Sequence, residues 1–377
     1  MSAHPDDDRV VDTVVMPFTT AQVGGSHVSG TTLGASLQRV YGVRSIVVAP
    51  EGAEVLDLAR GLGMEGQVSG DPARWRHRPD RDLLRTPARV AMLRALPGRR
   101  LVHCNDLGAL QAWAPAARLL GIPLVYHCRA FDRDRWFNRL VIRSADHVIS
   151  IARGVDASLS FLPAERRSVL VNPFSTPLSV DSAAARRRLL DDLGVAEARI
   201  VGFVGNMWKR KRPEMFVDIA QRLAATDPDL RFVLFGRDGD VTSDTMRAKI
   251  AAAGLSDRFL LAGFRLPPEA NLAALDLLLM PALDEPFGRT PVEALLLGIP
   301  YVAADDAGHS EIHARWGGGR VLPIPADADA YAAVCRDVLA NPDAVRLPPE
   351  RRREIHAELS PDRHGIDVMN VYRSMRR

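Results

Sequence analysis

Short apolar runs alternate with longer amphipathic stretches along the chain, and this alternation limits the possible fold more than any other feature. The runs are rich in β-branched residues. In the first half they are VDTVVMPF, RSIVVAP, RRLVHCN, PLVYHCR and DHVISIA, and in the second half RIVGFVGN, RFVLFGR, RFLLAGF, LDLLLMPA and IPYVAAD. The stretches between them, such as RPEMFVDIAQRLAATD, have helical periodicity. Near-continuous apolar strands that alternate with helices predict an α/β fold with doubly wound parallel sheets.

The pattern runs through the chain twice, which predicts two domains in the 377 residues. The segment LVNPFSTPLSVDSAAARRR is rich in Pro and Ser and lacks a strand pattern, so we place the boundary near residue 175. The predicted domains span 1–175 and 176–358. The tail, 359–377, has Ile366, Met369 and Tyr372 at three-residue steps and predicts a terminal helix.

Composition and charge exclude several classes of protein. The charged share is 25% and the net charge +3, which gives no sign of nucleic-acid binding. The opening residues MSAHPDDDRVVDT do not have the pattern of a secretory signal, and no apolar run approaches the roughly 20 residues that span a bilayer. The three cysteines, Cys104, Cys128 and Cys335, form no disulfide framework. We therefore expect a cytoplasmic protein.

The ends of the predicted strands carry the candidate ligand contacts, because parallel sheets bind ligands at the carboxyl ends of their strands. After VVMPF come Gly24, Gly25 and Gly30, ahead of a helical pattern. Glycines let a ligand approach the backbone, and a helix N-terminus favours an anion. A flexible connecting loop is the alternative. The spacing differs from G-x-G-x-x-G, which argues against a dehydrogenase.

Two of the three lysines of the chain, Lys209 and Lys211, follow the strand IVGFVG, although the chain has forty-six arginines. Lysine is a compact point charge that suits a phosphate, whereas arginine is a planar fork. Pro213 fits the first turn of the next helix. This position predicts a diphosphate site, and a solvated basic run is the alternative.

The run LDEPFGRTPVEALLLG places Glu285 and Glu293 eight residues apart. We expect Thr290 to be the N-cap of a helix, with Pro291 at its first position, Glu293 completing a capping box and Gly298 at the C-terminal end. In the simplest alternative, Glu293 only caps its own helix and Glu285 is a solvated loop carboxylate.

The run EPFGRTPVEALLLGIPYVAADDAGHSEI resembles the Glu-x7-Glu signature of the retaining GT-B glycosyltransferases of family four, also called glycosyl transferases group 1. The resemblance extends to the VGG loop, VYHC, the NP linker, FVGNMWKRKRP, LAALDLLLMP and the terminal helix, and it is closer in the second half. It implies two Rossmann-like domains facing across a cleft: 1–175 on the acceptor side, 176–358 for the nucleotide-sugar donor, and 359–377 as a helix crossing back to the first domain.

The resemblance also implies roles for single residues. Glu285 would accept hydrogen bonds from hydroxyls of the donor sugar, and Glu293 would bind the ribose. The other implied donor contacts are Gly24, Gly25, Gly205, Asn206, Phe264, Phe287, Gly288, Arg289 and Thr290.

One family position departs from the usual residue. The family has Gly-Arg followed by Lys five residues after that Arg; counting from Gly205, the lysine is Lys211 but the arginine is Asn206. Either Arg289, Lys209 or Arg210 compensates, or the diphosphate is held less tightly. The family's Gly-Gly turn is also incomplete, since Ala307 and His309 flank Gly308.

His127, at the end of LVYHC, matches the family histidine near the reacting sugar, and a core histidine is the alternative. His103 and Cys104 sit similarly at a strand end, but no paired-ligand spacing such as C-x2-C supports a metal site. We therefore expect neither a metal nor another cofactor.

The resemblance implies a retaining glycosyltransferase, and the cations at the predicted diphosphate site make a metal ion unnecessary. Negative charge develops on the leaving diphosphate, where Lys211, helix N-termini and loop amides would stabilise it. The resemblance favours front-face attack, with Glu285 positioning the sugar. The alternatives are a GT-B sugar-nucleotide epimerase and a catalytically idle sugar-nucleotide-binding protein, the latter favoured by the departures at Asn206 and His309.

Two arginine-rich segments of the first half, RWRHRPDRDLLR and RDRWFNR, interleave cations with Trp75, Trp136 and Phe137. Such segments suit anionic lipid headgroups at the inner face of a membrane or a lipid-phosphate acceptor, and an ordinary arginine-rich surface is the alternative. We expect a glycan, lipid-linked or small-molecule acceptor.

Overall fold

The computed structural model describes residues 10–70, 79–131, 136–178 and 180–375, and the chain divides into two compact units. The first unit comprises Met1–Ser175 together with Leu359–Arg377, and the second comprises Thr176–Glu358. The sequence also placed a boundary at residue 175. Because the last segment returns to the first unit, the two ends of the chain belong to the same body.

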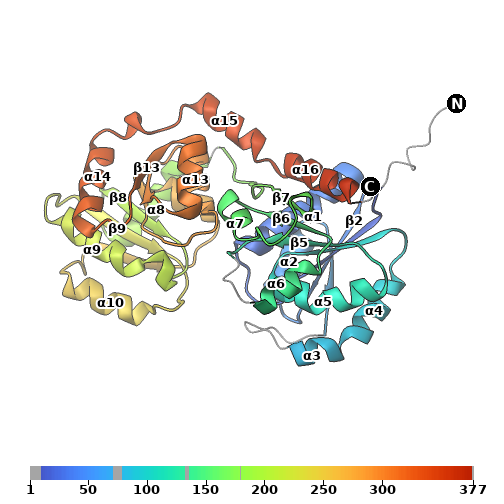
Figure 1. The fold of residues 1–377 in the computed structure, drawn as a ribbon. Helices are drawn as coiled ribbons and strands as arrows, with labels where there is room; N and C mark the ends of the chain where they lie inside the picture. The colour runs from blue at the N-terminus through green and yellow to red at the C-terminus, as the bar shows by residue number, and fades with distance from the viewer. Residues whose placement is uncertain (1–9, 71–78, 132–135, 179, 376–377) are drawn as a thin grey trace. The chain divides into compact units, whose positions relative to one another are not determined.

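The first unit is built on a seven-stranded parallel sheet with the order β3-β2-β1-β4-β5-β6-β7 (Figure 1). Its strands are β1 (Thr13–Pro17), β2 (Arg44–Ala49), β3 (Glu65–Val68), β4 (Arg100–Cys104), β5 (Leu124–Cys128), β6 (His147–Ser150) and β7 (Arg167–Val169). Every residue of β1 and β5 is buried, so helices cover both faces of the sheet there. The strand order reverses between β1 and β4, which makes their carboxyl ends the ligand-binding switch point of such a sheet.

The helices of this unit are α1 (Gly25–Tyr41), α2 (Glu54–Gly61), α3 (Pro79–Leu84), α4 (Thr86–Ala95), α5 (Leu107–Leu119), α6 (Trp136–Arg143), α7 (Arg153–Ala157), the 3₁₀ helix η1 (Ala164–Arg166) and α16 (Pro361–Ser374). The last helix packs along α1. A Cβ added at Gly365 would lie 2.4 Å from Ser36 Oγ, so the absence of a side chain at Gly365 lets the two helices approach closely. Ser36 donates a hydrogen bond to Asp362 across the same contact.

A buried cluster of histidines connects α16 to the sheet. His103, at the end of β4, lies 2.7 Å from the Tyr372 hydroxyl through Nδ1 and 3.2 Å from His127 Nδ1 through Nε2. The His127 ring is stacked on His364 of α16. Burial lowers the pKa of His103 and of His364 to about 3, with the charge of Arg129 acting in the same direction, so both rings are neutral. The cluster belongs to the core of the first unit.

The second unit is built on a six-stranded parallel sheet with the order β10-β9-β8-β11-β12-β13. Its strands are β8 (Arg199–Val204), β9 (Leu230–Phe235), β10 (Phe259–Gly263), β11 (Leu277–Met280), β12 (Tyr301–Ala304) and β13 (Gly319–Leu322). Its helices are α8 (Ser182–Leu193), η2 (Lys209–Lys211), α9 (Pro213–Ala224), α10 (Ser243–Ala252), α11 (Pro268–Ala273), α12 (Arg289–Leu297), α13 (Ala307–Trp316), α14 (Ala328–Ala340), η3 (Pro342–Ala344) and α15 (Pro349–Glu358). The order reverses between β8 and β11, so the loops after these strands meet at the switch point.

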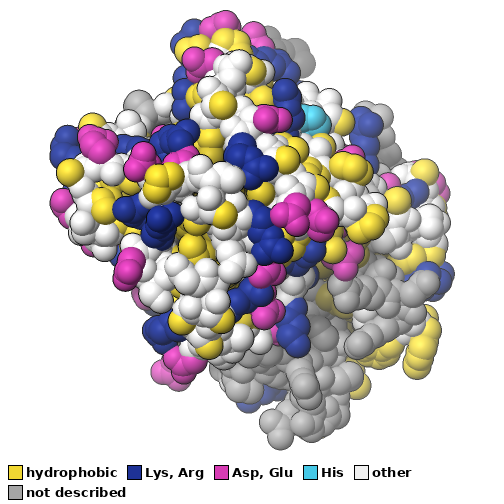
Figure 2. Space-filling model, turned by 90° about the vertical axis from the view of Figure 1, so that its left-hand side faces the viewer, with side chains coloured by type: hydrophobic (Ala, Val, Ile, Leu, Met, Phe, Trp, Pro, Cys, Tyr) yellow, Lys and Arg dark blue, Asp and Glu magenta, His cyan; other side chains and the backbone are white. Residues whose placement is uncertain are grey.

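The surface and the helices add two observations. On the side of the molecule drawn in Figure 2, basic and acidic side chains are interspersed among the described residues, unlike the single-sign basic patch typical of nucleic-acid binding.

In the part of the chain that the structure describes, no helix combines the length and the apolar character needed to cross a bilayer.

Candidate functional site

The loop after β8 brings a lysine onto the carboxyl end of the second sheet. Lys211 closes the short 3₁₀ helix η2 and folds back over Gly205, where an added Cβ would lie only 2.9 Å from Lys211 Nζ. The absence of a side chain at Gly205 therefore leaves room for the ammonium group. The Lys211 side chain is 15% exposed, so its charge acts in a partly desolvated site.

Glu285, in the loop after β11, meets this lysine. Its Oε2 accepts a hydrogen bond from Arg210 Nη1 at 2.6 Å and lies 3.7 Å from Lys211 Nζ. Burial acts to raise the pKa of Glu285, but Lys211, Arg210 and His309 together outweigh it and hold the pKa below its ordinary value. The structure thus brings Lys211 next to the ionised carboxylate of Glu285, the two central residues of the predicted site.

The loop between Glu285 and α12 corrects one prediction. The helix begins at Arg289, after Gly288 at φ +94°, so Thr290 is not the N-cap and the expected capping box does not form. Thr290 instead donates a hydrogen bond to the Val204 carbonyl at 3.4 Å, and Arg289 pairs with Glu293 at 3.2 Å. The left-handed turn at Gly288 starts the helix earlier than the side-chain pattern indicated.

The start of α13 packs directly against the same loop. Gly308 N donates to the Glu285 carbonyl at 2.9 Å, and an added Cβ at Gly308 would lie 2.2 Å from the Phe287 carbonyl oxygen. Only glycine allows the two backbones to approach so closely. Ala307, in the other position of the family's Gly-Gly turn, adopts φ +47°, a left-handed conformation unusual for alanine. Ala307 therefore holds a backbone conformation that a glycine adopts without strain.

His309, which sequence reasoning noted only as a departure, lies beneath this loop. It is 0% exposed, and neither ring nitrogen has a hydrogen-bond partner. Burial lowers its pKa to about 4. The sequence signal for it was a histidine directly after Gly308 where the turn meets the helix.

Asn206, at the position where the family has arginine, joins two loops through its side chain. Its Oδ1 accepts a hydrogen bond from the Arg237 backbone N–H at 3.1 Å, joining the loops after β8 and β9. The Arg237 guanidinium lies 4.1 Å from the ring centroid of Phe264, which is 49% exposed after β10. Arg237 was not predicted, because its pairing with Phe264 joins two separate loops.

The remaining predicted residues belong to the first unit. Gly24 is the N-cap of α1 and Gly25 is its first residue; the Gly24 N–H donates to His27 Nδ1 at 3.1 Å. His27 Nε2 lies 2.9 Å from the Thr20 hydroxyl. The imidazole therefore connects both ends of the loop between Thr20 and Gly24. His127 is 0% exposed within the histidine cluster, and its Nε2 has no hydrogen-bond partner. Its role near the reacting sugar stays a prediction.

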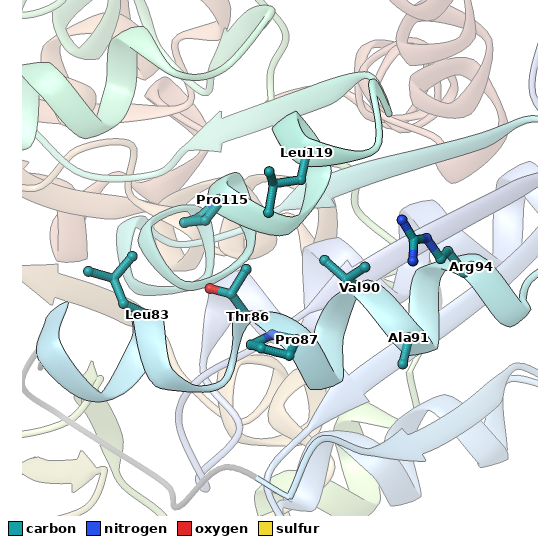
Figure 3. Close-up of a pocket in the computed structure, with 8 residues that line it drawn as sticks. All are labelled: Leu83, Thr86, Pro87, Val90, Ala91, Arg94, Pro115 and Leu119. Atoms are coloured by element: carbon teal, nitrogen blue, oxygen red, sulfur yellow. The ribbon is translucent and has the colours of Figure 1, made fainter.

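Two further features of the described residues bear on the predicted site, namely possible metal ligands and an apolar groove. Within residues 10–70, 79–131, 136–178 and 180–375, no group of three or more His, Cys, Asp or Glu side chains could hold a metal ion. An apolar groove of about 600 Å³ is formed by α3, α4 and α5. Figure 3 shows the side chains that line it. It is lined by Leu83, Thr86, Pro87, Val90, Ala91, Arg94, Pro115 and Leu119, none of which is a predicted site residue.

Replacement of Gly288 by alanine tests the loop geometry. An added Cβ at residue 288 would lie 2.7 Å from His309 Cδ2, at a backbone φ that alanine disfavours. We expect Gly288→Ala to cost about 1–3 kcal/mol of unfolding free energy and to displace the Glu285 loop. Thermal unfolding of the variant measures this. Gly194→Ala, at φ +68° with open space around its Cβ, is the control for strain alone. An equal loss in both variants would contradict a contact with His309.

Two family models match the chain and together cover most of it. The model described as Glycosyl transferases group 1 matches residues 188–356, and the model described as Glycosyltransferase Family 4 matches residues 23–176.

Similar proteins are known from both sequence and structure. A 2-deoxystreptamine glucosyltransferase of Streptomyces kanamyceticus is 34% identical over 276 residues, which is 65% of this chain and 68% of that protein. A 2-deoxystreptamine N-acetyl-D-glucosaminyltransferase of Streptomyces fradiae is 33% identical over 303 residues, 71% of this chain and 68% of that protein. The structure of Anabaena Alr3699/HepE with UDP-glucose superposes with a TM-score of 0.81 at 20% identity, covering 96% of this chain and 99% of that one.

Proposed function

The chain belongs to the glycosyl transferases group 1 of glycosyltransferase family 4, has the GT-B fold and is a nucleotide-sugar glycosyltransferase, and for its donor we propose a UDP-hexose. The proposed reaction moves the hexose to a hydroxyl group of the acceptor, retains the anomeric configuration and requires no metal ion. The HepE structures with UDP and with UDP-glucose support the choice of nucleotide by fold alone.

The observation that carries this proposal is the cluster of Glu285, Arg210 and Lys211 at the switch point of the second sheet. Two cations converge on one buried carboxylate, beside the starts of α12 and α13. Helix N-termini and cations together attract an anion, and the carboxylate accepts hydrogen bonds from sugar hydroxyls. A sugar joined to a diphosphate presents both chemical groups side by side.

The proposed mechanism uses this charge arrangement. The bond between the anomeric carbon and the diphosphate oxygen breaks, so negative charge develops on the diphosphate while the sugar becomes oxocarbenium-like. Lys211 and Arg210 would stabilise the diphosphate. The acceptor hydroxyl attacks from the same face and passes its proton to the departing phosphate oxygen, which gives retention. Glu285 would hold the sugar hydroxyls and form no covalent bond.

These cations would also stand in for a divalent metal, because they supply positive charge where the leaving group develops its negative charge. Arg210 is the residue best placed to replace the arginine missing at position 206. Its side chain is 37% exposed and its guanidinium already contacts Glu285, whereas Arg289 pairs with Glu293. The Lys209 side chain is exposed, and its backbone N–H is bound to Asp240.

The loops around Phe264 would hold the nucleoside. The ring of Phe264 is half exposed and carries the Arg237 guanidinium on one side, which forms an edge of aromatic and cationic character for a base. Glu293, whose side chain is 18% exposed, would accept hydrogen bonds from the ribose hydroxyls in competition with Arg289.

The acceptor is proposed to be a polyhydroxylated small molecule or a glycan. Two relatives named above are 2-deoxystreptamine glycosyltransferases by name, and a third, from Rhizobium leguminosarum bv. viciae, is named a lipopolysaccharide core biosynthesis mannosyltransferase. Both kinds of acceptor present several hydroxyl groups.

A nucleotide-binding assay tests the proposed donor, with Lys211→Ala as the variant. We expect UDP at about 100 times its Kd to stabilise the wild-type protein by about 2.7 kcal/mol. Loss of a charged hydrogen bond to the diphosphate in Lys211→Ala should weaken UDP binding about 10- to 100-fold. Lys249→Ala is the matched control, since Lys249 pairs with Asp218 on a neighbouring helix. Thermal shifts with UDP, GDP and ADP measure the effect.

Turnover of UDP-glucose and UDP-N-acetylglucosamine with aminocyclitol and glycan acceptors then tests catalysis. Proton NMR of the product should show the anomeric configuration of the donor retained, in buffer containing a chelator. An inverted product or loss of turnover with the chelator would contradict the mechanism. Nucleotide binding without turnover on any acceptor would favour the idle binding protein, and a changed donor sugar would favour the epimerase.

We also propose a peripheral membrane contact through the first unit. Exposed apolar side chains lie on the neighbouring elements α3, α5 and α6, namely Leu83, Leu84, Leu119, Trp136 and Leu140. Arg94 lines the groove together with Leu83 and Leu119 (Figure 3). Arg139 and Arg143 lie against the ring of Phe161. Aromatic and apolar groups among arginines suit an anionic headgroup region. Trp75 lies outside the described residues.

Co-sedimentation with vesicles tests this contact. We expect binding to phosphatidylcholine vesicles that contain phosphatidylglycerol, and several-fold weaker binding of the variant Trp136→Ala/Leu140→Ala, because less apolar surface enters the headgroup region. Leu266→Ala is the control, since Leu266 is 72% exposed on the other unit. Equal binding by all three proteins, or no binding to anionic vesicles, would contradict the contact.

A further inference from the structure

His309 is a buried imidazole that the ligand-free site leaves without a hydrogen-bond partner. Its side chain is 0% exposed, and both ring nitrogens are unpaired. A buried polar group without a partner is destabilising, and such groups are few in native proteins. An apolar side chain would fill the same space without this cost, so packing alone does not account for a histidine here.

The ring lies under the loop that carries Glu285. A Cβ at Gly288 would lie 2.7 Å from His309 Cδ2 and 3.0 Å from Nε2, so this edge of the ring faces Gly288. The residue before it, Gly308, donates its N–H to the Glu285 carbonyl. The imidazole is therefore held between α13 and the proposed sugar-binding loop, within the second unit.

The charges that face His309 are those of the proposed donor site. Burial lowers the pKa of His309 to about 4, and among the charged groups Glu285 has the largest effect, in the opposite direction. Asp306 also raises the pKa of His309, whereas Lys211 and Arg210 lower it. His309 in turn contributes to the lowered pKa of Glu285. The charge of each group therefore acts on the pKa of the other, which indicates that the ring and the carboxylate lie near one another.

Donor binding would change the partners of Glu285. In the ligand-free site its Oε2 is held by Arg210 at 2.6 Å and approached by Lys211 at 3.7 Å. On the proposed function, on which this step rests, the donor diphosphate draws both cations toward itself. The Glu285 side chain is only 13% exposed, so a carboxylate that loses its cations there needs a new hydrogen-bond donor.

We propose that His309 is a positioning residue of the donor site, whose imidazole N–H donates a hydrogen bond to the Glu285 carboxylate when the donor diphosphate draws Arg210 and Lys211 away. The neutral ring has one N–H donor and lies against Gly288, in the loop that carries Glu285. One hydrogen bond from this donor would leave the other carboxylate lone pairs for the hydroxyls of the sugar. The cost of an unpaired imidazole in the empty site is thereby relieved when the donor binds.

Two substitutions at the same position test the proposal, with UDP as the probe. His309→Leu removes the hydrogen bond and also the unpaired buried group, so we expect its melting temperature without ligand to equal or exceed that of the wild type. Its affinity for UDP should be about 10-fold lower, or weaker still. His309→Gln, whose amide N–H can replace the imidazole N–H, should restore affinity to within about threefold. A purely structural histidine would lower the ligand-free melting temperature instead.

His313→Gln on the same helix is the matched control, because the charged groups that act on His313 are Asp305 and Arg320 rather than Glu285. Its UDP affinity should equal that of the wild type. If His309→Leu binds UDP as tightly as the wild type, the proposal is wrong while the proposed function stands. If the wild type binds no UDP, the UDP-donor proposal fails first, and this inference falls with it.

A direct measurement covers the case in which His309→Leu folds poorly. Nitrogen-15 NMR of the ten histidines, with the His309 signals assigned by their loss in His309→Gln, reports the hydrogen-bonding state of each ring nitrogen. UDP should shift one His309 nitrogen toward the value of a hydrogen-bonded N–H. Unchanged His309 signals at saturating UDP would overturn the proposal.

Discussion

The ion cluster of Glu285, Arg210 and Lys211 is the interaction on which the proposed donor site depends. A carboxylate that is 13% exposed stays ionised only because two cations face it, and the cations are held in place by that carboxylate. Such a cluster is stable without a ligand, yet it consists of the groups that a sugar diphosphate would recruit. The charges that would bind the donor are therefore already fixed by contacts within the protein.

Glycines set the geometry of this cluster. Gly205 leaves room for the Lys211 ammonium, Gly288 turns the chain into α12 above His309, and Gly308 lets two backbones touch. Gly205 and Gly288 lie in the loops after β8 and β11, and Gly308 lies at the start of α13 after β12; these are three neighbouring strands of one parallel sheet. Strand order brings the loops together, and the missing side chains let them close around a small ligand.

The sequence predicted the central strands well because they are buried on both faces and therefore read as continuous apolar runs. It missed β3, β7 and β13, which lie at sheet edges, have three or four residues each and are partly exposed, so their composition carries no such run. The prediction of Thr290 as an N-cap was wrong because the backbone of Gly288 determines where α12 starts. The sequence pattern TPVE favoured an N-cap by the Thr290 side chain, because it matches a capping box.

The proximity of Lys211 and Glu285 was expected from their strand ends, and the structure places them 3.7 Å apart. The contacts of Arg210 with Glu285 and of Arg237 with Phe264 could not be predicted, because each joins loops from different strands and depends on rotamers. His309 was visible in the sequence as an unusual residue, but only burial without a hydrogen-bond partner gives it a physical meaning.

The most direct test of the account is a crystal structure of the protein with a UDP-sugar. The account predicts the diphosphate within hydrogen-bond distance of Lys211 Nζ, Arg210 turned from Glu285 toward it, and the sugar hydroxyls on the Glu285 carboxylate. A nucleotide bound elsewhere, or a diphosphate that leaves the Arg210–Glu285 pair intact, would contradict it.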